Sequence, residues 1–431
     1  MNAEDRARRW EETLGTYRYR WVMLGIWLVM MTVNSVSLVN YPLALPSIAR
    51  EFNVPPATFS YYLGVLSYSL GLFVIYFGNV RGWMNTRVKY AVMLAQLFLI
   101  TTLFLIPLAR TYSEVVVLRF IQGLWFMELG LATLNLRGWF GKNEIAIAMA
   151  APLSALQFGS ALGGLLEKTL VLQVGWREAF MVTGAMDAAA TALFLALYRD
   201  AEGYREYLII SRRRNLELRG RFGCPPPYRL LVAYTIGFAQ IATTMAFASI
   251  PYLVPTYGYF MRFDVVAVSN TVLIYGVLSG VGIWGGAILG SLLVRGTRTV
   301  RETFVARNLT RTISYVISFV GFLVLLLFRY DYFMYTLGAV LAALILFNIP
   351  NYWAEMVEVV PPGISGDFVF FAGSIASAGF FLGPLISVYL IVTAHGDVTE
   401  GFVLFLMIIV VSGVINILQN RVTLPVERYR V

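Results

Sequence analysis

The chain has 431 residues, of which 58% are hydrophobic and 13% charged, with a formal net charge of +9 and a mean hydropathy of +0.71. These values exclude an ordinary soluble globular domain and predict an integral membrane protein. Cys224 and His395 are the only residues of their types. The chain therefore cannot build an internal disulfide or a Cys/His metal site, and we expect no metal and no cofactor.

About a dozen segments are long and apolar enough to cross a bilayer, which takes about 20 residues each. Residues 1–20 are charged and lack the apolar core and cleavage site of a signal peptide, so we expect a tail there. The expected spans are 21–45, 59–80, 88–108, 115–136, 144–166, 179–198, 229–254, 266–293, 309–328, 333–354, 368–392 and 401–420. The sequence thus predicts an all-α membrane protein with twelve transmembrane helices.

The basic residues set the expected orientation. Most of the 33 Lys and Arg fall in the tails and the even-numbered connections if the N-terminus is cytoplasmic. Because positive charge is retained on the inner side, we predict a multi-pass protein of the inner (cytoplasmic) membrane with both termini in the cytoplasm. This distribution explains the net charge without nucleic acid, so the expected partners are the bilayer and a small solute, and we expect a monomer.

The longest connection separates six spans from six. It contains Arg212, Arg213 and Arg214, which we interpret as a topology signal near anionic headgroups, with a lipid-specific site as the alternative. The predicted parts are a cytoplasmic tail at 1–20, a six-helix bundle at 21–198, a cytoplasmic linker at 199–228, a second six-helix bundle at 229–420 and a cytoplasmic tail at 421–431.

Small residues recur at four-residue spacing in the second, fifth, eighth and eleventh spans. Such spacing places them on one helix face and allows close helix approach in lipid. They include Ser67 and Gly71, Gly159 and Gly163, Gly276 and Gly280, and Gly379 and Gly383. We therefore expect these four helices to form the seam between the two bundles.

Four stretches in the expected order resemble the major facilitator superfamily of transporters. Arg119-Phe120-Ile121-Gln122-Gly123 is similar to the RxxQG signature of its fourth helix, and the stretch from Arg137 to Ala146 resembles the loop that follows. Gly175-Trp176-Arg177-Glu178-Ala179-Phe180 is similar to the entry to helix six, and Gly383-Pro384 to a pair in helix eleven. The resemblance covers nearly the whole chain and implies two bundles rocking about a midplane site.

One departure concerns the loop between the second and third helices. The family usually carries an acidic residue four positions after the glycine, but here Gly78 is followed at that spacing by Gly82. Arg81 and Arg87 keep the basic part, and we assign them to gating. The sequence thus looks like a divergent prokaryotic member.

Two carboxylates lie deep within expected spans, Glu128 in the fourth and Asp187 in the sixth. An ionised carboxylate in hydrocarbon costs at least a few kcal/mol, so such a group can serve to bind and release a proton. Glu128 lies on a helix that the resemblance places at the cavity and is the leading carrier of a proton or of Na⁺, with a structural hydrogen bond or a substrate contact as alternatives. Asp187 is either a structural acid or a second proton site.

Arg119 is expected to be the only basic group deep in a span. A guanidinium binds carboxylates in a fork, so Arg119 could anchor an anionic substrate. The resemblance gives the alternative, a structural or gating role. At 1.5 Å and 100° per residue, Arg119 and Glu128 point to different sides of the helix, and we expect no direct pair.

Neutral polar residues on the lining helices are further candidates for substrate binding. The resemblance assigns the lining to helices one, four, seven and ten. The candidates are Asn34, Asn40, Gln157 on helix five, Gln240, Asn348 and Asn351. Pro350 lies among them and interrupts helix ten, either as a plain kink or as a break that exposes backbone groups to substrate.

Glu355 and Glu358 lie three residues apart at the end of the tenth span and share a helix face. We expect either a solvated helix end or an inner gate formed with arginines from neighbouring loops.

Taken together, these features predict a secondary active transporter for a small organic solute, preferably an organic anion, coupled to protons. The alternatives are proton-driven export of amphiphilic compounds and a non-transporting receptor or scaffold; an enzyme is not expected, since no nucleophile and base pair lies within the spans.

Overall fold

The computed structural model describes residues 2–425 apart from 15, 56–57, 79–86, 142–143, 211–212, 214–228, 264, 329, 361 and 394–398. Across these residues the regular structure is helical throughout. Eleven of the described helical segments are long and apolar enough to cross a membrane, and a shorter apolar helix over Ser60–Ile75 occupies the second expected span. The predicted all-α architecture of twelve membrane helices is confirmed.

The first half of the chain begins with a short helix outside the apolar spans and continues with six spans. Its elements are α1 (Ala3–Thr13), α2 (Arg20–Glu51), η1 (Ser60–Tyr62), α3 (Leu63–Gly78), α4 (Val88–Leu105), η2 (Ile106–Leu108), α5 (Tyr112–Gly123), η3 (Leu124–Met127), α6 (Glu128–Arg137), α7 (Ile145–Gln173) and α8 (Trp176–Leu197).

The second half repeats the pattern of six spans after the linker. Its elements are α10 (Leu231–Phe260), α11 (Val265–Arg295), α12 (Val300–Leu327), α13 (Tyr332–Ala343), η5 (Leu344–Asn348), α14 (Ile349–Glu358), α15 (Pro362–Thr393), α16 (Thr399–Leu418) and η6 (Gln419–Arg421). The linker residues 214–228 lie outside the described part of the chain.

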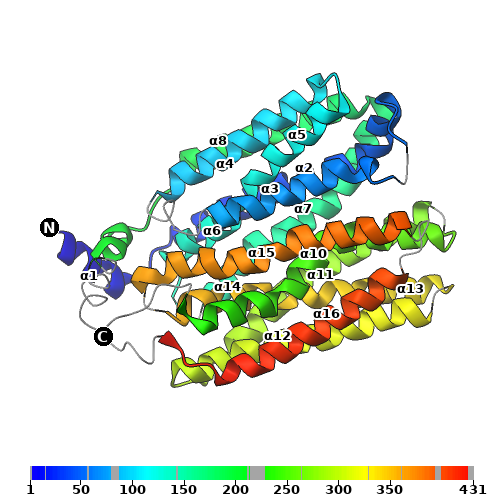
Figure 1. The fold of residues 1–431 in the computed structure, drawn as a ribbon. Coiled ribbons are helices and arrows are strands. Elements are labelled where there is room, and N and C mark those ends of the chain that lie inside the picture. Colours follow the sequence, from blue (N-terminus) through cyan, green and yellow to red (C-terminus); the bar gives the residue numbers. More distant parts are fainter. Residues whose placement is uncertain are drawn as a thin grey trace.

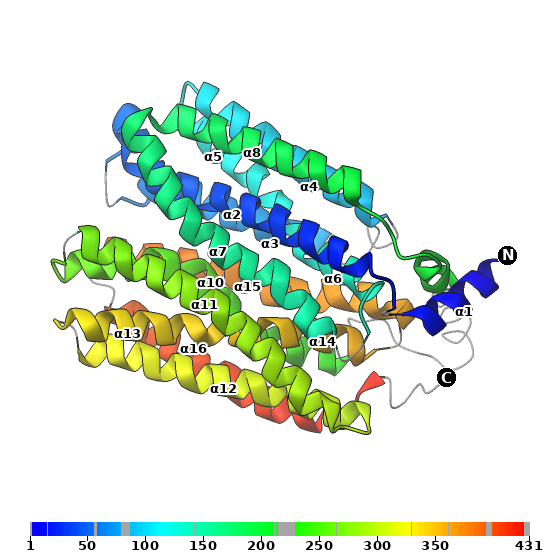
Figure 2. The same cartoon turned by 180° about the vertical axis from the view of Figure 1, so that it is seen from behind.

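The helices form two lobes that lie side by side. Helices α2 to α8 make up the N-lobe and α10 to α16 the C-lobe, and both chain termini lie at one end of the molecule, hereafter the termini end (Figure 1). Seen from behind, α7 lies against α11, whereas α3 lies against α15 (Figure 2). The second, fifth, eighth and eleventh spans therefore form the seam, as predicted.

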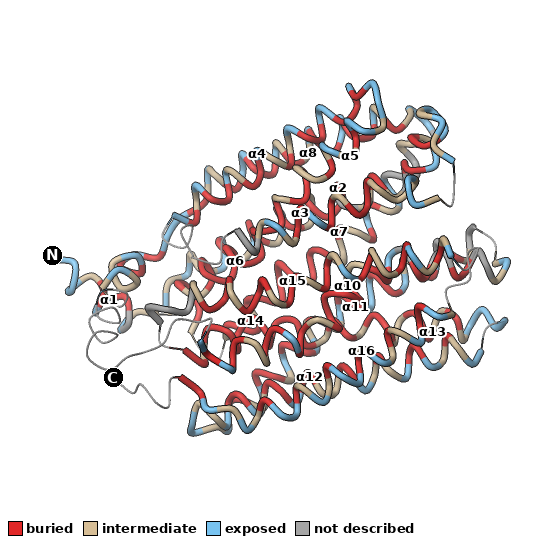
Figure 3. Tube along the Cα trace, viewed as in Figure 1, coloured by how far each residue is buried: buried red, intermediate tan, exposed pale blue. Residues whose placement is uncertain are grey.

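The small residues on these helices serve mainly the packing within each lobe. A methyl group added at Gly159 would lie 2.2 Å from the Thr32 carbonyl oxygen of α2, and one at Gly379 would lie 2.1 Å from Thr244 Oγ1 of α10. Most of these glycines therefore bring helices together within a lobe, whereas Gly276 and Gly280 of α11 face Ala161 and Phe158 of α7 across the seam. Buried residues cluster on the faces that the helices turn inward (Figure 3).

Helix α12 begins at Val300, nine residues before the expected span. Thr299 accepts a hydrogen bond from the Glu302 backbone and the Glu302 carboxylate accepts one from Thr299, which forms a capping box. The early turns of the helix contain two arginines, Arg307 and Arg311, and both are buried. The sequence-based boundary missed these turns because charged residues lower their hydropathy.

Two spans are broken near their middle by 3₁₀ segments, η3 in the fourth span and η5 in the tenth. In each case a glycine from a neighbouring helix packs on the backbone there: Gly71 lies against Gly123 just before η3, and Gly286 against the Phe347 carbonyl in η5. Pro350 follows η5, where the proline predicted an interruption. The break at η3 has no proline and was not predicted.

Candidate functional site

A small cavity of about 30 Å³ lies between the lobes, near the middle of the membrane helices. At this volume it holds only a few water-sized molecules, so the site is nearly closed in this conformation. Residues from both lobes line it: Phe126, Leu129, Leu153, Leu156, Gln240, Thr244, Phe247, Ile283, Ile349, Tyr352, Trp353, Gly373, Ala376, Ser377 and Phe380.

Three aromatic rings bridge the lobes at this cavity. Phe126 in η3 contacts Phe380 in α15 with ring centroids 4.9 Å apart, and Phe247 in α10 lies 5.7 Å from Phe380 and 6.2 Å from Phe126. The tilted and edge-to-face geometries are the favourable ones for aromatic pairs. We call these three residues the aromatic trio.

Glu128 is the first residue of α6 and is fully buried. Its two carboxylate oxygens accept hydrogen bonds from carboxamides, Asn34 Nδ2 of α2 at 3.1 Å and Gln96 Nε2 of α4 at 2.8 Å. Gln96 Oε1 in turn accepts a bond from Thr191 of α8. The predicted candidates Glu128 and Asn34 are thus brought together, and both hydrogen-bond donors to this acid are neutral carboxamides.

Asp187 on α8 is also fully buried, and Ser37 of α2 donates a hydrogen bond to it. Asn40, one turn further along α2, donates to Thr183 of α8 at 2.5 Å. Helix α2 therefore lies between the two acids, with Asn34 on Glu128 and Ser37, three residues later, on Asp187. This arrangement keeps both carboxylates within one polar layer of the N-lobe.

Arg119 is buried between two tyrosines of neighbouring helices. Its guanidinium lies 4.5 Å from the ring centroid of Tyr41 and 4.2 Å from that of Tyr68, and it donates to Gln122 Oε1 at 2.5 Å. Tyr68 accepts a bond from Trp125, whose ring contacts Phe126 of the aromatic trio edge to face. Arg119 thus lies behind the cavity wall, in cation–π contacts that tie α5 to α2 and α3.

Gln240 is the candidate polar residue that lines the cavity. It is 1% exposed, and its Oε1 has no hydrogen-bond partner among the described residues. A buried acceptor without a partner costs about 1–3 kcal/mol, so a ligand that donates to it would recover that energy.

The remaining candidate amides are held by protein groups. Gln157 accepts a bond from Ser279 across the seam between α7 and α11. Asn348 donates to Ser314 of α12 at 2.8 Å. Asn351 accepts from Arg307 and donates to the Gly286 carbonyl. These contacts place the three amides outside the cavity lining and connect helices around η5.

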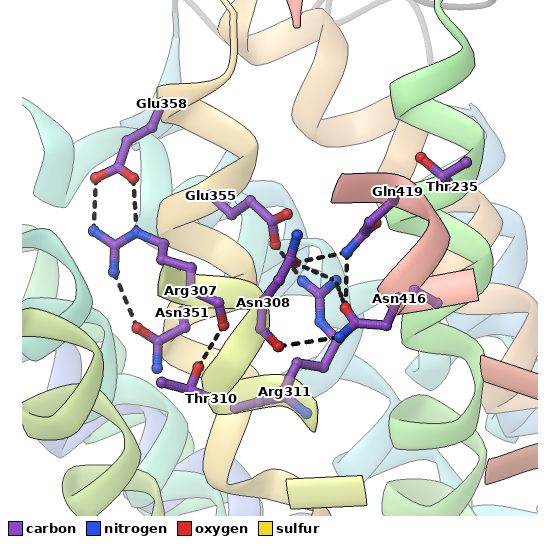
Figure 4. Close-up of polar contacts among 12 residues, drawn as sticks. Thr235, Arg307, Asn308, Thr310, Arg311, Asn351, Glu355, Glu358, Asn416 and Gln419 are labelled. Carbon is purple, nitrogen blue, oxygen red and sulfur yellow. Dashed lines mark hydrogen bonds and ion pairs between the residues drawn. The ribbon is translucent and has the colours of Figure 1, made fainter. Parts of the chain in front are cut away.

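The C-lobe contains a buried network of charges at its termini end (Figure 4). Arg307 of α12 binds Glu358 through two bonds of 2.7 Å, and Arg311 pairs with Glu355, which is 0% exposed. The network continues to α16 and η6. Arg311 donates to Asn416 at 2.9 Å, and Gln419 Nε2 donates to the side-chain oxygens of Asn416 and Asn308. We call these residues the C-lobe charge network.

Three expectations are corrected by this network. Glu355 and Glu358 do not form a solvated helix end, and their arginine partners come from helix α12 rather than from loops. Glu355 is a third deeply buried acid beside Glu128 and Asp187. Arg119 is not the only basic group deep in a span, because Arg311 is 1% exposed and lies within the span of α12.

The termini end also holds a direct bond between the lobes. Arg137, the last residue of α6, donates to the Val357 carbonyl of α14 at 2.7 Å. Arg81 lies outside the described residues, and Arg87 is exposed just before α4. In the sequence, Arg137 is named only as the first residue of the stretch to Ala146 that resembles the loop after helix four. Its role could not be predicted because its partner is a backbone oxygen 220 residues away.

The two lobes differ in the side chains that bind their buried acids. In the N-lobe, Glu128 and Asp187 are held by carboxamides and a hydroxyl, whereas in the C-lobe Glu355 and Glu358 are held by guanidinium groups. A buried acid beside neutral groups can change protonation without leaving a cation unpaired. Protonation of an acid that is paired to a buried arginine leaves that cation uncompensated, and breaking such a pair costs about 3–5 kcal/mol.

Comparisons with known proteins agree with this architecture. The family model described as Major Facilitator Superfamily matches residues 22–384. The structure aligns with the human organic anion transporter MFSD10 (TETRAN) at a TM-score of 0.68 and 13% identity, covering 92% of this chain and 99% of that one, which shows a shared fold.

Two curated relatives match part of the sequence. One is the probable sulfoacetate transporter SauU of Cupriavidus necator, 26% identical over 42% of this chain and 42% of its own length. The other is a galacturonate transporter of Dickeya chrysanthemi, 24% identical over 43% of this chain and 54% of its own length. The matched stretches thus span about half of each relative or less. The family match, which covers most of the chain, and the twelve helices in two lobes establish that this protein belongs to the major facilitator superfamily.

Proposed function

We propose that this membrane transporter moves a small organic anion across the inner membrane by alternating access and couples that movement to protons. The family membership makes it a multi-pass transporter rather than an enzyme. The anion preference draws on the names of its relatives, which handle sulfoacetate and galacturonate. The basic tails and even-numbered connections support a cytoplasmic location of both termini.

The observation that carries the coupling proposal is the position of Glu128. It lies at the mid-membrane break of the fourth span, two residues after Phe126, which lines the cavity. Its partners Asn34 and Gln96 are neutral, so protonation leaves no buried cation behind. We assign Glu128 as the proton carrier and Asp187 as a second acid in the same polar layer, with Na⁺ as the competing ion. Gln240 is assigned to substrate binding, because it offers an acceptor to the cavity.

The test is transport by purified protein in proteoliposomes. With an imposed proton gradient, Glu128→Gln is expected to abolish gradient-driven accumulation of radiolabelled galacturonate or another accepted acid, because glutamine cannot carry the proton. Substrate exchange without a gradient is expected to persist. Glu144→Gln, which removes a half-exposed surface carboxylate paired with Arg20, should leave both activities unchanged. Full accumulation by Glu128→Gln would refute the coupling role.

The aromatic and apolar walls of the cavity favour a second candidate, export of amphiphilic compounds in exchange for protons. Transport assays in the same proteoliposomes distinguish the two functions. Proton movement that is triggered by a lipophilic cation and by none of the organic acids would establish the exporter.

A further inference from the structure

The N-terminal helix packs on the membrane domain next to the bond that joins the lobes. Trp10 of α1 is 5% exposed, and its Nε1 donates to the Gly138 carbonyl oxygen at 2.8 Å. Gly138 directly follows Arg137, whose guanidinium reaches the Val357 carbonyl of the C-lobe. Trp10 of the N-terminal helix thus binds Gly138, the residue next to Arg137, which makes the contact between the lobes.

Residues at the start of the linker also pack on Gly138 and Trp10. The ring of Tyr204 packs so closely on Gly138 that an added methyl group there would lie 2.6 Å from it. Trp10 lies 5.0 Å from Tyr204 and 4.4 Å from Tyr207, measured between ring centroids. Burial raises the pKa of Tyr204 to about 12, as expected for a phenol enclosed by this packing.

Backbone geometry fits α1 to the linker. Gly203 has φ +83°, and a methyl group there would lie 2.2 Å from the Arg6 carbonyl oxygen, so only glycine permits this approach. Arg6 also pairs with Glu206 at 3.0 Å. Asn2 and Asp5 form a capping box that starts α1. The helix is therefore built to dock here.

We propose that α1 and residues 203–207 form a clamp that fixes the end of α6 and thereby positions Arg137 for its bond to Val357. Trp10 is a positioning residue in this arrangement, since it acts through Arg137 and touches no substrate. The clamp sets how firmly the termini end of the transporter is closed. This inference rests on the proposed alternating access, in which that end must open.

The consequence can be measured as the distance between the lobes. Nitroxide labels on Tyr90→Cys at the start of α4 and Arg298→Cys before α12, in a Cys224→Ser background, report the separation at the termini end by pulsed electron resonance. Arg137→Ala is expected to increase the long-distance population roughly tenfold, because it removes a bond from a charged donor. Trp10→Phe keeps a ring but removes the N–H donor and should increase that population about threefold.

The decisive comparison is the double variant. If Trp10 acts through Arg137, adding Trp10→Phe to Arg137→Ala changes the distance distribution no further. Trp21→Phe, which alters a half-exposed indole at the same end, serves as the matched control and should resemble the unsubstituted protein.

Three results would overturn the clamp. Trp10→Phe could leave the distribution unchanged while Arg137→Ala broadens it, which would retain alternating access but remove the role of α1. Alternatively, the two substitutions could add in the double variant, which would show that Trp10 acts independently of Arg137. No shift with Arg137→Ala would refute Arg137 as the closing contact and the clamp with it.

Discussion

At the scale of single residues, the buried acids of the two lobes differ in the side chains that bind them. Glu128 is surrounded by carboxamides, whereas Glu355 is fixed by Arg311. Both are fully buried and both lie in broken spans, so it is the neighbouring side chains that distinguish the proposed proton carrier from the acid of the ion pair. The C-lobe charge network is therefore expected to remain intact through the transport cycle.

Arg311→Met tests this structural role. The substitution leaves Glu355 buried without its cation, which is expected to lower the stability of the protein by about 3–5 kcal/mol. Arg311→Met combined with Glu355→Leu removes both charges and should recover most of the loss. Thermal unfolding in detergent measures the effect. Equal melting temperatures for Arg311→Met and the unsubstituted protein would show that the pair contributes little.

At the scale of elements, the two 3₁₀ breaks depend on glycines of neighbouring helices. Gly286 of α11 approaches η5 so closely that an added methyl group would lie 1.7 Å from the Phe347 carbonyl oxygen. Its neighbour Gly285 has 3.4 Å to the nearest atom, an ordinary contact. Adjacent glycines on one helix thus differ sharply in the space around them.

Gly286→Ala should force α11 away from η5 and destabilise the protein by about 1–3 kcal/mol. Gly285→Ala, as the matched control, should be neutral or stabilise the helix by up to about 1 kcal/mol. The comparison of the two melting temperatures checks the argument. A Gly286→Ala protein as stable as the Gly285→Ala protein would mean that the packing at η5 is looser than described.

At the scale of the whole molecule, the aromatic trio joins the lobes beside the cavity. Phe380→Ala removes a ring that touches both Phe126 and Phe247, and truncating a packed phenylalanine costs about 3–5 kcal/mol. In the proposed alternating-access cycle the lobes separate, so part of this loss should appear as a shift toward an open state.

The shift can be followed at Ser377→Cys, a cavity position, in the Cys224→Ser background. Phe380→Ala is expected to raise its rate of alkylation by a charged thiol reagent at least about tenfold in nanodiscs. Phe371→Ala is the matched control, since that ring lies on the same helix but contacts Tyr234 edge to face within the C-lobe. Similar rates in the two variants would refute the bridging role.

Hydropathy was enough for the twelve helices, because most spans are long apolar runs that each give an independent signal, and the long polar connection after the sixth span indicated the two-lobe division. The charged start of α12 was missed because Arg301, Glu302 and Arg307 lower the hydropathy of the turns before the expected span. The pairing of Arg307 with Glu358 and of Arg311 with Glu355 joins residues 51 and 44 positions apart, for which local spacing carries no signal. Glu128 stood out in the sequence, whereas its partner Gln96 could be found only from the packing of α4.

The breaks at η3 and η5 have a mechanical consequence for the termini end. Beyond each break lies a helix of 10 residues, α6 or α14, which carries Arg137 or Val357 at its far end. A 10-residue helix is a rod about 15 Å long, so a tilt of about 10° at the break moves its tip by about 2.6 Å. Such a displacement is enough to separate the 2.7 Å contact between them. A small bend at either break would therefore be enough to open this contact without a rotation of either lobe as a whole.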